Sequence, residues 1–98
     1  MTLRRFVIER DVPGVGLNDE AGFCALAHVS NEALRRLGNR IQWDHSYVTG
    51  NKIYCVYLAE DEQVVRDHAR IAGFPANVIT EVRRIFDPTT AAISRVRE

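Results

Sequence analysis

The sequence predicts one α+β domain whose strands and helices follow one another in the order β-α-β-β-α-β. Three observations predict it: four segments have the alternation or the tyrosine and β-branched content of strands, two segments repeat apolar residues at helical spacing, and glycine, proline or capping residues separate them. The 98 residues suffice for one hydrophobic core. We expect the domain to span residues 1–88, with residues 89–98 as a C-terminal tail.

The first half of the chain supplies one strand and one helix. Residues 3–9 are expected to form the first strand, because Phe6 and Ile8 alternate with more polar neighbours. A loop rich in glycine follows, and Asn18 is a suitable N-cap for the first helix. The helix is expected to end at Gly38, since glycine readily adopts the left-handed conformation of a helix stop.

The second half begins with a hairpin. Residues 41–48 and 53–59 are expected to form its two strands, joined by a tight turn that contains glycine and asparagine. Asp61 is expected to cap a second helix, and Gly73 to end it. Residues 78–86 then form the last strand. This order is the split βαβ arrangement of a ferredoxin-like sandwich, a four-stranded antiparallel sheet with both helices on one face.

The hairpin register decides which side chains the helices cover. If Gly50 and Asn51 are the two loop residues, paired positions sum to 101 and one side of the hairpin is the more apolar. We expect the covered face to hold Phe6, Ile8, Trp43, His45, Tyr47, Tyr54, Val56 and Leu58. The open face is then expected to hold Arg5, Val7, Glu9, Asp44, Ser46, Cys55 and Tyr57. In the last strand either parity is possible, and Glu81 and Arg83 lie on the open face if Val78 and Val82 point inward.

An open face of this kind, part charged and part aromatic, suggests a dimer. Two copies packed face to face would enclose its side chains in a cleft, so we expect a homodimer with a binding site between the copies. The expected ligand-binding residues are Glu9, Asp44, Tyr57 and Arg83. The alternative is that the charged residues form cross-strand ion pairs on a solvated surface.

Two histidines are candidates for metal ligands. His68 lies in the apolar stripe of the second helix, and the register above places His45 on the same covered face. Imidazole is the commonest metal ligand, and Cys55 and Glu62 are nearby donors that complete a set suited to nickel, copper or zinc. No metal-binding spacing of known specificity is present. The alternative is that each ring is hydrogen-bonded to a carbonyl or a tyrosine. His28 is expected to be exposed on the first helix.

Composition excludes several classes of function. Thirteen basic residues balance thirteen acidic ones, which argues against a nucleic-acid partner or an anionic membrane surface. No apolar run approaches the roughly 20 residues of a membrane span, and residues 1–20 contain no signal-peptide core. Two lone cysteines fit a cytoplasmic protein. The sequence contains no nucleophile elbow and no phosphate-binding loop, so it indicates no nucleotide cofactor and does not identify an enzyme.

Several motifs resemble a family of small bacterial proteins of unknown function, one actinobacterial member of which binds nickel. The resemblance covers nearly the whole chain and rests on residues 6–10, 43–48, 52–57, 67–69, 73–76 and 87–88. It implies a ferredoxin-like homodimer that binds a divalent transition metal, and the resemblance favours nickel. His45 and His68 are the histidines that lie within the matching motifs.

The sequence thus leaves three readings of the function open. The first is a cytoplasmic, homodimeric metal-binding protein with ligands among His45, His68, Cys55 and Glu62. The second is a small-molecule binding or cofactor-free enzymatic module that uses the cleft on the open sheet face. A plain interaction domain is the third reading.

Overall fold

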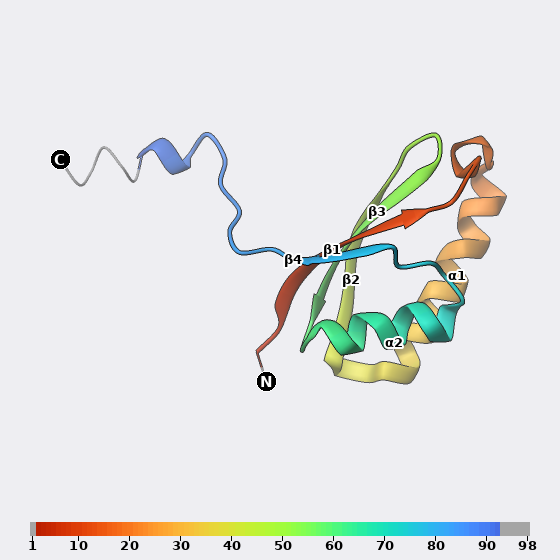
Figure 1. Ribbon diagram of the computed structural model, residues 1–98, viewed down its shortest axis with the longest axis horizontal. Helices are drawn as coiled ribbons and strands as arrows, with labels where there is room; N and C mark the ends of the chain where they lie inside the picture. Colours follow the sequence, from red (N-terminus) through yellow and green to blue (C-terminus); the bar gives the residue numbers. More distant parts are fainter. Residues whose placement is uncertain (1, 93–98) are drawn as a thin grey trace.

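The computed structural model describes residues 2–92 of the chain. The strands and α-helices occur in the order expected from the sequence, with two short 3-10 turns flanking the first helix (Figure 1). Their bounds are β1 (Arg4–Asp11), η1 (Val15–Leu17), α1 (Glu20–Leu37), η2 (Gly38–Arg40), β2 (Ile41–Val48), β3 (Lys52–Ala59), α2 (Glu62–Ala72) and β4 (Val78–Glu81). No helix within residues 2–92 is long and apolar enough to cross a membrane.

The four strands form one antiparallel sheet in the order β2-β3-β1-β4. Both α-helices lie on the same side of this sheet, and within residues 2–92 no helix or strand covers the other face (Figure 1). The expected ferredoxin-like sandwich is therefore confirmed. Apolar side chains between the sheet and the helices form the core: Phe6, Ile8, Ile41, Cys55, Tyr57, Ala59, Val64 and Val65.

Most element boundaries follow from local capping chemistry. Asp61 caps α2 by accepting a hydrogen bond from the Val64 backbone, and Gly73 ends it in the left-handed conformation, as expected. The cap of α1 is Asp19, one residue after the expected Asn18; its carboxylate accepts from the Gly22 backbone. An aspartate in this position also interacts favourably with the positive end of the helix dipole.

The last strand is shorter than expected. β4 ends at Glu81 instead of residue 86: Val78 to Glu81 pair with β1, and beyond them the backbone nitrogen of Val82 donates to the Arg5 carbonyl. The chain then leaves the sheet as an extended arm that reaches away from the body (Figure 1). Ile85 and Phe86 on this arm are exposed. The expected tail at 89–98 lies within the described residues only as far as 92.

The expected faces of β2 and β3 are mostly reversed. Cys55 and Tyr57 pair with Ile8 and Phe6 of β1 and are buried on the covered face, and Ser46, which pairs with Cys55, is partly buried on the same face. The open face instead holds His45, Tyr47, Tyr54, Val56 and Leu58. For the last strand, where either parity was possible, the structure places Glu81 on the covered side, because it pairs with Phe6. The placement of Phe6 and Ile8 on the covered face is confirmed.

A β-bulge explains how part of the expected register survives. His45 pairs with Val56 and Tyr47 with Tyr54, as expected, but Trp43 pairs with Tyr57 instead of Leu58. The irregularity lies between Trp43 and His45, where one extra residue reverses the alternation. Trp43 therefore faces the helices while His45 does not.

The segment just before α1, which contains η1, is hydrogen-bonded to the turn of the β2–β3 hairpin. The backbone nitrogen of Gly14 donates to the Asn51 side chain, and that of Gly16 donates to the Gly50 carbonyl. A Cβ atom at Gly16 would lie 2.7 Å from the Thr49 carbonyl oxygen, so only glycine fits this close approach. This attachment fixes where α1 begins relative to the sheet.

Candidate functional site

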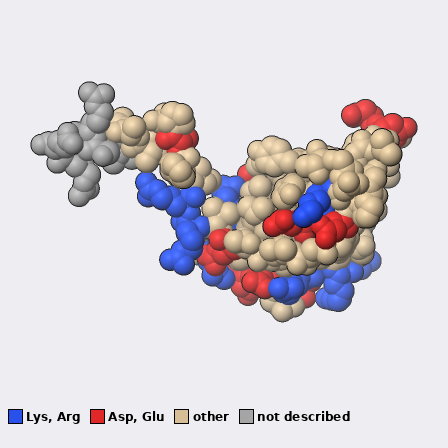
Figure 2. All heavy atoms as spheres, turned by 45° about the horizontal axis from the view of Figure 1, so that its top comes forward, with Lys and Arg blue, Asp and Glu red and all other residues tan. Residues whose placement is uncertain are grey.

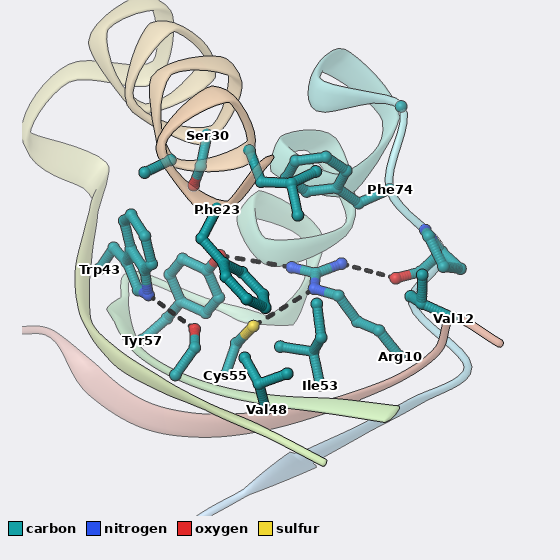
Figure 3. Close-up of a pocket in the computed structure, with 15 residues that line it drawn as sticks. Arg10, Val12, Phe23, Ser30, Trp43, Val48, Ile53, Cys55, Tyr57 and Phe74 are labelled. Carbon is teal, nitrogen blue, oxygen red and sulfur yellow. Dashed lines mark hydrogen bonds between the residues drawn. The ribbon is translucent and has the colours of Figure 1, made fainter. Parts of the chain in front are cut away.

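A cavity of about 620 Å³ lies between α1 and the sheet. Its lining is almost entirely apolar and comes from β1, α1, β2, β3 and the loop after α2 (Figure 3). The lining residues are Arg10, Val12, Phe23, Leu26, Ala27, Ser30, Trp43, Ser46, Val48, Ile53, Cys55, Tyr57, Gly73, Phe74 and Pro75. Val48 is 43% exposed, so the cavity reaches the surface at this side. Its volume lies in the ordinary range for small-molecule sites.

Small side chains leave this space open. On the face of α1 that is turned to the sheet, the middle positions are Ala27 and Ser30, and opposite them lie Ser46 and Cys55. Near its C-terminal end the same helix packs on the core through Leu34 and Leu37. The hairpin is hydrogen-bonded to the segment just before α1. The helix therefore passes over these small residues and leaves a gap between them and the sheet.

Arg10 is the one charged residue in the lining, and it is 2% exposed. Its Nε donates to Cys55 Sγ at 3.4 Å, one terminal nitrogen to the Pro75 carbonyl at 2.6 Å, and the other to the Tyr57 hydroxyl at 3.3 Å. The guanidinium also lies within 6 Å of the ring centres of Tyr57 and Phe74. These contacts tie β1, β3 and the loop after α2 together (Figure 3).

No carboxylate balances this cation within the described part of the chain. The salt bridges there involve other residues, and the lining contains no Asp or Glu. Arginine is a permanent cation, and burying a charge costs several kcal/mol unless an opposite charge or strong dipoles compensate. Neutral acceptors and two aromatic rings supply only part of that compensation.

A second buried polar group lies behind the cavity wall. His68 is fully buried, its ring is 5.1 Å from that of Tyr57, and its Nε2 lies 3.2 Å from Ser30 Oγ and 3.3 Å from the Ser30 carbonyl oxygen. This carbonyl can only accept, so we assign the proton to Nε2. Nδ1 is then a buried acceptor without a hydrogen-bond partner.

Burial, and secondly the charge of Arg10, lower the pKa of His68 from 6.5 to about 4. The ring is therefore neutral at physiological pH. Burial likewise raises the pKa of Tyr57, so its hydroxyl stays protonated and available for hydrogen bonds. The polar groups at the cavity are thus one fixed cation and several neutral groups.

The four residues expected to bind a metal do not come together. His68 and Cys55 are buried on the covered side, but His45 is on the open face and its side chain is 45% exposed. Glu62 is at the exposed start of α2, where it pairs with Arg66. Within residues 2–92 no three His, Cys, Asp or Glu side chains form a group that could hold a metal ion. These four residues thus form no common site within the described part of the chain; His28 is exposed on α1, as expected.

The four expected ligand-binding residues are also dispersed. Glu9 lies on the open face and Asp44 at the bulge, where Lys52 and Arg5 respectively pair with them. Tyr57 is on the opposite, covered face and lines the cavity. Arg83 is exposed beyond the end of β4. The alternative, cross-strand ion pairs on an open face, is what the structure shows for Glu9 and Arg5.

Charges on the visible surface are mixed. Figure 2 shows acidic and basic side chains interspersed between neutral areas, with basic residues gathered where the C-terminal arm leaves the body. On the open face, a hydrogen bond from Arg5 holds the pKa of Asp44 below its ordinary value. Asp44 also lies 3.4 Å from Nδ1 of His45.

Sequence reasoning did not identify Arg10 as a site residue. The available signal was its parity, because Arg10 continues the alternation of Phe6 and Ile8 and so points to the covered face. An arginine at an inward position of a strand is rare unless something pairs with it.

Comparison with known proteins identifies the relatives of this chain. The sequence profile of a family described as "Nickel responsive protein SCO4226-like" matches residues 6–82. Among solved structures, the crystal structure of SCO4226 from Streptomyces coelicolor A3(2) is similar, with a TM-score of 0.67 and 17% identity over 84% of this chain and 99% of that one. No curated protein matches the chain. At this identity the structural match shows the shared fold.

The neutral state of His68 predicts a pH-dependent stability. The unfolded chain protonates this histidine near pH 6.5 and the folded chain only near pH 4. The stabilisation that depends on a neutral His68 is therefore fully present above pH 6.5. As the pH falls from 6.5 to 4, the free energy of unfolding decreases by about 3 kcal/mol in all. Urea denaturation at several pH values should show a steeper loss for the wild type than for His68→Gln. Equal slopes for both proteins would contradict the assignment.

Proposed function

The chain belongs to the nickel-responsive SCO4226-like family, and from that premise we propose that it is a binding protein whose site is the cavity between α1 and the sheet. The observation that carries the proposal is the cavity itself: about 620 Å³ of apolar space inside a domain of 98 residues. A concave, mostly apolar space of this volume with a few polar groups is typical of small-molecule binding sites. A bound molecule would remove its apolar lining from water.

The lining defines the kind of molecule that fits. Phe23, Trp43 and Phe74 offer flat apolar surfaces, and these favour a compact aromatic or branched aliphatic body. The indole nitrogen of Trp43 already donates to Ser46, so this ring presents its apolar faces to the cavity. The sequence led us to expect a cleft on the open face of the sheet. The site that we now propose lies on the opposite, helix-covered face.

Filling the cavity should abolish binding. Ala27→Phe places a ring in the space, whereas Ala25→Phe puts the same ring on the exposed side of α1. We expect 2-naphthamide, a neutral probe, to shift the NMR signals of cavity residues in the wild type and in Ala25→Phe, but not in Ala27→Phe. Thermal melting checks that both variants fold. Undiminished binding to Ala27→Phe, or none to the wild type, would exclude this site.

Nickel binding is a second candidate, supported by the family description and by one contact. His45 lies on the open face with Nδ1 3.4 Å from the Asp44 carboxylate. A carboxylate next to one ring nitrogen orients the other nitrogen toward a metal, as is common around histidine ligands. One chain supplies too few donors, so we propose that nickel is shared between two copies at this face.

Removal of His45 should therefore weaken nickel binding. In calorimetric titrations of tag-free protein, we expect His45→Ala to lose most of the affinity for Ni²⁺. His28→Ala, which removes an exposed histidine from α1, should retain it. Equal affinity of His45→Ala and wild type would remove His45 from the nickel site.

We also propose that the protein is a cytoplasmic homodimer whose copies meet through their open sheet faces. Val7 and Val56 occupy the middle of that face, and the ion pairs Arg5–Asp44 and Lys52–Glu9 give it both signs of charge. A face with both signs can complement a second copy of itself across a two-fold axis. Both cysteines, Cys24 and Cys55, are free thiols, as a reducing compartment would keep them.

Sedimentation measurements test the dimer. We expect the wild type to sediment as a dimer and Val56→Arg as a monomer, because an arginine at the centre of the face would be buried without a partner. Val29→Arg introduces the same charge on the exposed surface of α1 and should remain dimeric. A monomeric wild type, or a dimeric Val56→Arg, would contradict this interface.

A further inference from the structure

We infer that the cavity binds an organic carboxylate, with the acid group placed on Arg10 and the apolar body between α1 and the sheet. This inference rests on the proposed binding site and adds the chemical class of its ligand. It derives from the charge of one lining residue, which the volume and apolarity of the cavity do not explain.

The first step is the missing counter-charge. Arg10 is 2% exposed, and its three hydrogen bonds go to a thiol, a phenol and a backbone carbonyl. None of the three acceptors is a carboxylate. A guanidinium has five N–H groups, so two of them take no part in these bonds. An anion is the partner that would use them and remove the electrostatic cost of burial.

The second step is the position of the guanidinium. It belongs to the cavity wall, lies 5.6 Å from the centre of the Phe74 ring (Figure 3) and donates to the Pro75 carbonyl. The bonds to Tyr57 and Pro75 hold it from two sides, so its orientation is set before a ligand arrives. A preorganised donor loses little conformational entropy on binding.

The third step is the shape of the remaining space. A carboxylate on Arg10 leaves its substituent facing Phe23, Trp43 and Ile53. These residues offer no counter-charge for a second ionic group. The site therefore suits a monoanionic acid with an aromatic or branched apolar body, and not a polyphosphate or a sugar acid with many hydroxyl groups.

Two probes of equal shape test the acid group. We expect 2-naphthoate to bind the wild type about tenfold or more tightly than 2-naphthamide, since a hydrogen bond between two charged groups is worth more than its neutral counterpart. In Arg10→Met this preference should disappear, while 2-naphthamide still binds. Arg83→Met removes an exposed arginine and should keep the preference.

The outcomes separate this inference from the proposed site. If neither probe binds the wild type, the cavity is not a binding site and the inference falls with it. Equal binding of both probes to the wild type overturns the inference alone, as does a preference that persists in Arg10→Met.

Arg10→Met removes three hydrogen bonds, so a measurement on the wild type guards against a variant that does not fold. The ¹⁵N NMR signal of Arg10 Nε should shift on addition of 2-naphthoate and not of 2-naphthamide. An unchanged Nε signal in the presence of bound 2-naphthoate would overturn the inference.

Discussion

The buried guanidinium of Arg10 is the contact on which the arrangement of this domain depends. It extends from β1 and bonds to Cys55 and Tyr57 on β3 and to the carbonyl of Pro75 after α2. Those three bonds join two strands to the loop that leads into β4. They also require Cys55 and Tyr57 to face the helices, because a buried guanidinium without acceptors would cost several kcal/mol. The burial of Cys55 and Tyr57 on β3 agrees with this requirement.

The position of α1 follows from a second constraint. Its beginning is held by the hairpin turn through Gly16, and its last turns pack on the core through Leu34 and Leu37. Between these ends the helix presents Ala27 and Ser30 to the sheet, where side chains are too small to fill the gap. The cavity is thus a consequence of where the large residues lie along one helix. Arg10 gives that otherwise apolar cavity its single charge.

Membership in a nickel-responsive family does not by itself locate a metal site in this chain. The histidine inside the fold, His68, is held by Ser30 and stays neutral at physiological pH because of burial and the charge of Arg10. A metal cation near Arg10 would be repelled by the positive charge of the guanidinium. The exposed His45, on the opposite face, is free of that constraint. The metal and the organic ligand therefore belong to different faces of the sheet in our proposals.

The capping and turn residues made the fold predictable from the sequence. Asp61, Gly38 and Gly73 act through bonds and backbone conformations within a few residues, so the ends of α1 and α2 could be derived without tertiary information. The cap at Asp19 instead of Asn18 is a displacement of one residue among neighbouring capping groups. The length of β4 was less predictable, because it depends on how much of β1 remains unpaired.

The site was not predictable in the same way. Both faces of β3 are apolar enough to be covered, so hydrophobicity did not distinguish them, and one residue of bulge separated Trp43 from His45. The sequence by itself determined the order of elements, their caps and the ferredoxin-like architecture, because these follow from local conformational preferences. Only the tertiary structure decided which side of the hairpin is buried, where the cavity lies and that Arg10 lines it, because these depend on contacts between residues far apart in the chain.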